Sequence, residues 1–255
     1  GVSQKSLSYA EFTIPSNLKE QEKIATFFLG LGNLITLHQR KCDSLVNLQK
    51  ALLQKMFPKN GESVPEVRFP GFTEPWEQRK FGDIGSVSMC KRIFKEQTSE
   101  HGDIPFYKIG TFGGQPDAFI DRKLFEEYKM KFSFPQKGDI LLSASGTIGR
   151  IVEYDGAEAY FQDSNIVWLS HDKTITNKFL KVLYPLVKWN GIEGSTIQRL
   201  YNDTFLKTSF MMPSLQEQEK IGTFFEHLDN LITLHQRKVQ ALQKLKKALL
   251  QQMFV

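Results

Sequence analysis

The chain contains one forty-residue stretch twice: LKEQEKIATFFLGLGNLITLHQRKCDSLVNLQKALLQKMF (Leu18–Phe57) and LQEQEKIGTFFEHLDNLITLHQRKVQALQKLKKALLQQMF (Leu215–Phe254). Without gaps, 28 of the 40 aligned positions are identical, and the two copies are offset by 197 residues. Solenoid repeats have periods of about 20–50 residues, so this offset indicates one element duplicated around a unique insert.

Each copy has the pattern of a long helix with a coiled-coil seam. The expected seam residues are Ile24, Phe27, Leu31, Leu34, Leu45, Leu48 and Leu52, and, in the second copy, Ile221, Phe224, Leu228, Leu231, Leu242, Leu245 and Leu249. Ser214 with Glu217 predicts a capping box, and Asn17 with Glu20 matches it in the first copy. A helix of about 38 residues spans about 57 Å and cannot bury its own stripe, so we expect the copies to pair as an antiparallel coiled coil.

Polar residues interrupt the expected seam at the same place in both copies. His38 and Lys41, repeated as His235 and Lys238, predict either a polar layer that fixes the register or a solvated patch. A metal site or proton switch is disfavoured because no carboxylate or cysteine is repeated beside these histidines. The identical LITLHQRK also favours two copies of one partner related by a pseudo-two-fold axis. The candidate partner-binding residues are His38, Arg40, Lys41, His235, Arg237 and Lys238.

The composition of the 255 residues, 40% hydrophobic and 24% charged, is that of an ordinary globular protein. The sequence has no apolar run of about 18 residues and no signal peptide, so we expect no membrane association. Two cysteines exclude a disulfide scaffold and a Cys-rich zinc module, which favours the reducing cytoplasm. The missing first methionine suggests a processed chain or a fragment.

The net charge of +5 does not come from the middle of the chain. Residues 64–211 carry 19 Lys and Arg against 19 Asp and Glu, which leaves a local net charge of zero. Any anion that binds the insert must therefore meet a local patch of cations.

The insert reads as an α+β domain preceded by a Pro- and Gly-rich linker, 58–75. Strand-like runs are expected at Ile104–Gly110, Asp139–Ser143, Gly149–Tyr154 and Asn165–Leu169. A helix is expected over Thr176–Trp189, with a kink or an early end at Pro185.

Three regions of the insert carry side chains suited to anion or base contacts. The hairpin Gly138–Arg150 offers Ser145, Thr147 and Arg150 beside glycines, although in isolation a plain hairpin turn is the favoured interpretation. The segment Ser195–Phe205 offers Gln198, Arg199 and Asn202, which are residue types that read base edges, although a polar loop is the alternative. The runs CKRIFK and YKIGTFGG add Lys91, Arg92 and Lys108 as candidate phosphate contacts.

Enzyme signatures are nearly absent. The sequence has no methyltransferase tetrad, no G-x-G-x-x-G, no P-loop and no triad spacing. Asp117, Glu127 and Lys129 fit the loose PD…(D/E)xK pattern of Mg-dependent nucleases, in which two carboxylates hold the metal and a lysine orients water. We keep that nuclease as one alternative function, and a coiled-coil scaffold whose domain binds protein as another.

The duplicated helix, EVRFPGFTEPWEQRKFGDI (66–84), GDILLSASGTIGR (138–150) and STIQRLYNDTFLKTSFMMPSLQEQEKI (195–221) together resemble the specificity subunit of type I restriction–modification systems. The resemblance implies a partial chain, because SLSYAEFTIPS (6–16) aligns with TFLKTSFMMPS (204–214). We therefore expect the following: 1–16, the end of a first recognition domain; 17–57, conserved helix 1; 58–75, the linker; 76–213, a target-recognition domain; and 214–255, conserved helix 2.

This resemblance implies a non-catalytic, DNA-binding subunit that reads one half of a bipartite double-stranded DNA target. The helices would set the half-site spacing and dock methyltransferase subunits, and a motor-nuclease subunit would complete the complex. The chain itself would bind no cofactor, since S-adenosylmethionine, ATP and Mg would be held by the partner subunits. An intramolecular rod, a homodimer and a swapped pairing are all compatible with the sequence.

Overall fold

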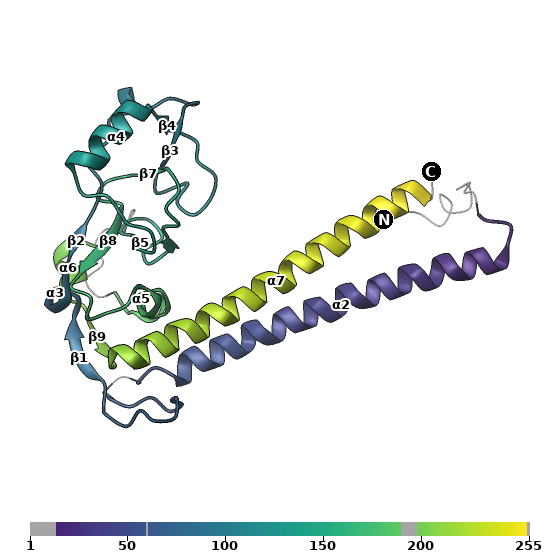
Figure 1. Cartoon of the computed structure of the whole chain (residues 1–255), viewed down its shortest axis with the longest axis horizontal. Coiled ribbons are helices and arrows are strands. Elements are labelled where there is room, and N and C mark those ends of the chain that lie inside the picture. Colours follow the sequence, from purple (N-terminus) through teal and green to yellow (C-terminus); the bar gives the residue numbers. More distant parts are fainter. Residues whose placement is uncertain (1–13, 60, 190–197, 254–255) are drawn as a thin grey trace. The chain divides into compact units, whose positions relative to one another are not determined.

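The computed structural model describes residues 14–59, 61–189 and 198–253, and these form two compact units (Figure 1). One unit contains the chain up to Leu53 and from His227 onward, and the other contains Gln54–Glu226. The expected domain remnant over 1–16 lies almost wholly outside the described residues, and so do Ser195, Thr196 and Ile197 of the candidate DNA segment. No helix among the described residues is long and apolar enough to span a membrane.

The first unit is an antiparallel helix pair, formed by α2 (Leu18–Lys55) as far as Leu53 and by α7 (Leu215–Met253) from His227 onward (Figure 1). The Nδ1 atoms of His38 and His235 lie 3.0 Å apart, and Gln49 Nε2 donates to Asp229 Oδ1 at 2.7 Å. From the first contact to the second, the residue number rises along α2 and falls along α7. The predicted antiparallel pairing is therefore confirmed. Because His38 and His235 are equivalent in the repeat, the pseudo-two-fold axis passes between them.

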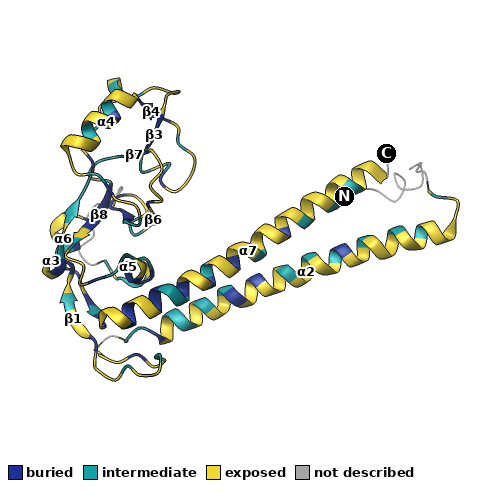
Figure 2. Ribbon diagram, in the orientation of Figure 1, coloured by how far each residue is buried: buried dark blue, intermediate teal, exposed yellow. Residues whose placement is uncertain are grey.

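Each heptad contributes two residues to the seam, and the second of these differs from the predicted one. The buried seam residues include Leu31, Cys42, Leu45, Leu228, Ile232 and Val239. Figure 2 shows buried positions in dark blue at intervals along both long helices. Five predicted seam residues are instead exposed: Phe27, Leu34, Leu48, Leu231 and Leu245. The second seam position therefore lies one residue later than the heptad assignment. This shift buries Cys42 and Val239 in place of Lys41 and Lys238, whose ammonium groups would be costly to desolvate.

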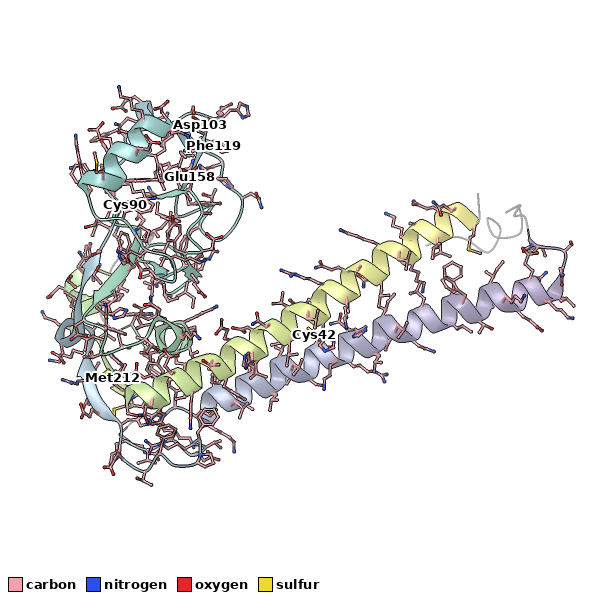
Figure 3. The ribbon with its side chains drawn as sticks, viewed as in Figure 1. Cys42, Cys90, Asp103, Phe119, Glu158 and Met212 are labelled. Atoms are coloured by element: carbon pink, nitrogen blue, oxygen red, sulfur yellow. The ribbon has the colours of Figure 1, made fainter. Side chains whose placement is uncertain are left out.

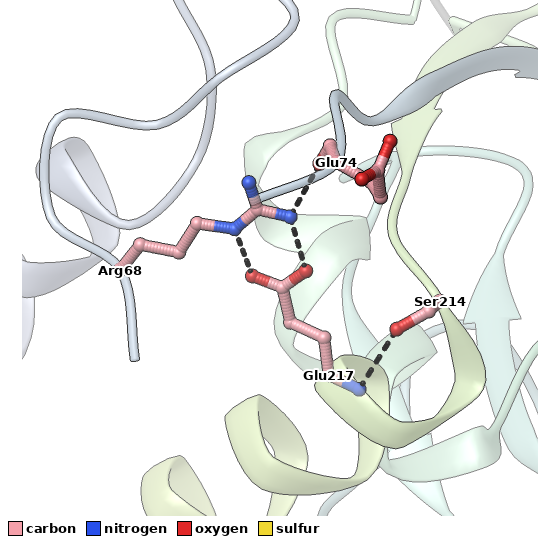
Figure 4. Close-up of polar contacts among 4 residues, drawn as sticks. All are labelled: Arg68, Glu74, Ser214 and Glu217. Atoms are coloured by element: carbon pink, nitrogen blue, oxygen red, sulfur yellow. Dashed lines mark hydrogen bonds and ion pairs between the residues drawn. The ribbon is translucent and has the colours of Figure 1, made fainter. Parts of the chain in front are cut away.

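Both long helices begin with the predicted side-chain caps. Asn17 Oδ1 accepts a hydrogen bond from Lys19 N at 2.9 Å, and Ser214 Oγ accepts one from Glu217 N at 3.4 Å. The Glu217 carboxylate binds Arg68 rather than closing the capping box, as Figure 4 shows.

The second unit has α+β architecture, as predicted. A four-stranded antiparallel sheet has the order β2 (Gly85–Ser88), β8 (Ile166–His171), β5 (Ile140–Ser143) and β6 (Ile151–Glu153), with Leu141 opposite both Val152 and Trp168. A second sheet has the order β4 (Phe119–Ile120), β3 (Ile104–Tyr107) and β7 (Tyr160–Phe161), in which β7 is parallel to β3. The strands β1 (Glu77–Lys80) and β9 (Ser209–Met212) pair separately.

Short helices join these strands: α3 (Phe81–Ile84), η1 (Lys95–Gln97), α4 (Arg122–Lys131), α5 (Asn177–Leu183), η2 (Tyr184–Leu186) and α6 (Asn202–Lys207). Thr176 Oγ1 caps α5 by accepting a hydrogen bond from Phe179 N, and the helix gives way to a 3-10 turn at Pro185. The predicted early end of this helix is therefore confirmed.

Two aromatic clusters hold the second unit together. One surrounds the fully buried Tyr160, with Phe125 and Phe134 nearby, and the other stacks Phe210 on Phe81 with ring centroids 4.5 Å apart. Both cysteines are buried and free, Cys42 in the helical unit and Cys90 in the first of these clusters (Figure 3). Burial raises the pKa of the Cys90 thiol to about 12, so it serves as a packing residue and not a nucleophile.

The histidine pair predicts a pH-dependent helical unit. Partial burial, then His38, Lys238 and Lys41, lower the pKa of His235 below its ordinary value. A lowered histidine pKa means that the unfolded chain binds protons first, so we expect stability to fall as pH drops below about 6.5. Urea unfolding at pH 7.5 and 5.5 tests this. The pH dependence should weaken in His235→Gln and persist in the control His227→Gln; an equal slope in all three chains would contradict it.

Candidate nucleic-acid interface

The loop between β5 and β6 is a tightly bonded turn. Ser143 N donates to Arg150 O and Gly149 N donates to Ser143 O, while the Ser143 hydroxyl donates to Thr147 O. Gly146 and Gly149 have φ values of 66° and 86°, a region in which side chains are strained. The sequence thus specifies one loop conformation, which holds Thr147 and Arg150 exposed.

This loop pairs with a segment that lies about fifty residues further along the chain. Gly146 N donates to Gln198 O at 3.1 Å and Leu200 N donates to Ala144 O at 2.8 Å, so Ser145 and Arg199 form an antiparallel bridge. The structure therefore brings together two candidate segments that the sequence presented separately.

The glycine-rich stretch after β3 joins the same surface. Arg150 Nη1 donates to Phe112 O at 2.6 Å, and Thr111 Oγ1 accepts a hydrogen bond from Lys108 N. Lys108 itself is partly buried and forms an ion pair with Asp117 at 2.9 Å.

A turn that the sequence reasoning missed connects all of these segments. This turn comprises residues 162–165 (QDSN) between β7 and β8, and we call it the QDSN turn. Ile109 N donates to Gln162 Oε1 at 2.9 Å, Arg92 Nε lies 3.0 Å from Asp163 Oδ2, and the Ser145 hydroxyl donates to Asn165 Oδ1 at 2.6 Å. The sequence does contain a signal for this turn, because four polar residues directly follow the apolar Tyr160–Phe161 pair.

The candidate contacts differ in their accessibility. Lys91, Arg92, Thr147, Arg150, Gln198, Arg199 and Asn202 are exposed, and Asn202 is the first residue of α6. Lys91 also lies over the Phe132 ring, and its carbonyl oxygen accepts a hydrogen bond from the Tyr160 hydroxyl. Ser145 is only 3% exposed, and its hydroxyl is used by Asn165, so we correct its predicted role from a direct contact to a support of the loop.

The residues of the nuclease pattern do not form a metal site. Asp117 pairs with Lys108, Glu127 pairs with Lys131 within α4, and Lys129 lies over the rings of Phe125 and Phe134. No group of three or more His, Cys, Asp or Glu side chains suited to a metal occurs in the described part of the chain. The geometry therefore gives no support to the nuclease alternative.

The helical unit carries a duplicated surface beside its seam. Arg40, Lys41, Arg237 and Lys238 are exposed, whereas His38 and His235 are half-buried against each other. Next to the exposed basic residues lie leucines that are not buried in the seam. Leu34 and Leu37 are 47% and 61% exposed, and Leu231 and Leu234 are 45% and 47% exposed. We call these two sets the leucine patches.

The paired long helices and the loop-bearing α+β unit together define a protein of the DNA-specificity class. The sequence profile described as "Type I restriction modification DNA specificity domain" matches residues 73–244, and the chain belongs to this family.

Several relatives agree with this assignment. A putative type I restriction enzyme specificity subunit of Haemophilus influenzae is 58% identical over 158 residues, which are 60% of this chain and 41% of the relative. The MjaVIII specificity subunit of Methanocaldococcus jannaschii is 22% identical over 253 residues, 91% of this chain and 59% of the relative. The chain thus spans about half the length of these relatives.

Solved structures share the fold. The HsdS subunit of Thermoanaerobacter tengcongensis superposes with a TM-score of 0.56 at 17% identity, covering 91% of this chain and 56% of that one. The S subunit of M. genitalium gives a TM-score of 0.51 at 18% identity, with 95% and 62% covered.

Proposed function

We propose that this chain recognises one half of a bipartite double-stranded DNA target for a type I restriction–modification complex. The observation that carries the proposal is the backbone pairing of residues 144–146 with 198–200. It gathers Thr147, Arg150, Gln198 and Arg199 beside the QDSN turn. Arginine and glutamine side chains read base edges, and arginines also grip phosphates.

The helical unit acts in this proposal as a spacer and a docking platform. Two partners of one kind suit a surface that is repeated about a pseudo-two-fold axis, and we assign them as methyltransferase subunits. A motor-nuclease subunit completes the complex. Catalysis, and the binding of S-adenosylmethionine, ATP and Mg, belong to these partners, so the chain itself is non-catalytic and acts in the cytoplasm.

Arg199→Ala tests the DNA-reading surface. Arg199 is an exposed cationic residue that pairs with the β5–β6 loop through its backbone, so we expect its side chain to contact DNA. A lost bidentate base contact costs about 1–3 kcal/mol, equivalent to about a 5- to 150-fold loss of sequence-specific methylation by the assembled complex. A methylation assay on the defined motif measures this loss, and methylome sequencing shows whether the recognised motif changes.

The control is Arg122→Ala, which removes another exposed arginine, the first residue of α4, whose side chain pairs with Glu158. An unchanged rate and motif in Arg199→Ala would remove Arg199 from the interface. Failure of the wild-type complex to methylate any sequence-dependent motif would contradict the proposed function itself.

A further inference from the structure

Gln162 of the QDSN turn is held by the protein in one orientation. Its backbone N–H donates to Tyr107 O, and its side-chain oxygen accepts a hydrogen bond from Ile109 N, both at 2.9 Å. A backbone N–H can only donate, so the atom of the Gln162 amide that faces Ile109 must be Oε1. The side-chain nitrogen, with its two N–H groups, therefore points elsewhere.

The Gln162 Nε2 donors are available to a ligand. No described residue accepts a hydrogen bond from Nε2, and this atom is absent from the buried, unpaired side-chain atoms of the described residues, which are Trp76 Nε1, Arg79 Nε and Tyr184 Oη. Solvent therefore reaches Nε2. Two fixed donors without a protein partner are suited to a ligand that offers acceptors.

The rest of the QDSN turn favours an approaching polyanion. Asp163, the only carboxylate in the turn, is paired with Arg92 at 3.0 Å, so its negative charge is compensated. Ser164 has a φ of 52°, a left-handed conformation that is strained for a non-glycine residue and that is maintained by its neighbours. Asn165 is bonded to Ala144 N through its carbonyl oxygen and to the Ser145 hydroxyl through Oδ1, which fixes the turn against the paired loop.

We propose that Gln162 is a specificity-determining residue that donates to the major-groove edge of a guanine. Glutamine usually reads adenine by donating to N7 and accepting from N6. Here one lone pair of Oε1 is used by Ile109 N, which holds this oxygen against the backbone, whereas both N–H groups of Nε2 are unused. Two adjacent donors match guanine, which presents the two acceptors N7 and O6. This inference rests on the proposed function, since it assumes that the surface around the QDSN turn meets DNA.

Gln162→Glu is the most informative variant because it keeps the oxygen that binds Ile109 N and replaces the donor group with an acceptor. In the complex assembled with its methyltransferase subunits, we expect about tenfold or greater loss of methylation of the wild-type motif. Methylome sequencing should show that the loss comes from one guanine position of one half-site. Thermal unfolding checks that the variant remains folded.

Gln97→Glu is the matched control. Gln97 Oε1 likewise accepts a hydrogen bond from a backbone N–H, that of Phe94 at 2.8 Å, but its Nε2 faces the Tyr128 hydroxyl. The same chemical change is therefore made where the donor group already has a partner, and we expect motif and rate to stay as in the wild type.

Duplexes with 7-deazaguanine at each guanine of the motif in turn identify the contact. The wild-type complex should bind one of them about fivefold more weakly than the unmodified duplex, whereas the Gln162→Ala complex should not distinguish the two. A loss that is uniform over all sequences and reduces the salt dependence would instead indicate a phosphate contact and overturn the inference.

An unchanged motif and rate in Gln162→Glu would also overturn the inference while leaving the proposed function standing. A wild-type complex without any sequence-dependent methylation would overturn both.

Discussion

Replacing Arg68 with alanine is expected to lower the free energy of unfolding of the α+β unit by about 3–5 kcal/mol, because it leaves a buried carboxylate unpaired. Arg68 donates from Nε to Glu217 Oε1 at 2.7 Å and from Nη2 to Glu217 Oε2 at 2.8 Å, and Nη2 also donates to Glu74 O (Figure 4). The Glu217 side chain is 1% exposed and that of Arg68 is 12% exposed. This bidentate bond raises the pKa of Arg68, so the guanidinium stays charged.

A second bidentate pair in the same unit supplies the control for Arg68→Ala. Arg122 binds Glu158 with two bonds of 2.9 and 3.0 Å, but both side chains are about half exposed. Arg122→Ala should therefore leave urea unfolding almost unchanged, since water replaces the lost partner. The double variant Arg68→Met with Glu217→Met should recover much of the lost stability, because it leaves no buried charge. Equal unfolding midpoints for Arg68→Ala and Arg122→Ala would contradict the buried-pair explanation.

The Arg68–Glu217 pair also shows that equivalent residues of the two helix copies have different surroundings. Glu217 and Gln218 are buried at the start of α7, where Gln218 bonds Thr176 N and Thr174 O. The equivalent Glu20 at the start of α2 is exposed. A repeat in the sequence predicts two equal helices, but only the tertiary structure decides which copy the linker covers.

The sequence predicted the helical unit well except for half of its seam. The helix limits and the antiparallel pairing followed from the heptads and caps, which are local signals. Leu34 and Ile35 are both apolar, and so two adjacent stripes fit the same period of seven residues. The structure resolves this ambiguity through the lysines, because only one of the two stripes leaves Lys41 and Lys238 in solvent.

For the proposed DNA-reading surface, the sequence indicated the segments but not the contacts between their residues. Glycines and hydroxyl residues identified the β5–β6 loop, and the mixture of Gln, Arg and Asn identified the segment that pairs with it. Ser145 is buried and its hydroxyl donates to Asn165, a contact with a residue twenty positions away that the loop sequence alone does not indicate. Gln162 was missed for the same reason, since its orientation depends on a hydrogen bond to Ile109, which no local pattern encodes.

We also expect a large effect on methyltransferase docking when the leucine patches are changed. A two-fold axis that exchanges two antiparallel helices runs perpendicular to the pair, so the patches Leu34/Leu37 and Leu231/Leu234 lie on one face of it. Burying a leucine contributes about 1.5–3 kcal/mol. Converting Leu34 and Leu37 to aspartate should therefore weaken the docking of one methyltransferase subunit by at least about 100-fold. Native mass spectrometry should then find one methyltransferase bound to the chain instead of two.

The repeat makes this test internally controlled. The matching pair Leu231→Asp with Leu234→Asp should remove the other methyltransferase, and the fourfold variant should bind neither. Leu29→Asp is the control, because Leu29 is exposed but lies on the opposite side of α2 from the seam, and the equivalent position in α7 is Glu226. Equal loss of both subunits from either pair would mean that the partners bind as a preformed dimer. Retention of two subunits in the fourfold variant would show that the leucine patches are not the docking surface.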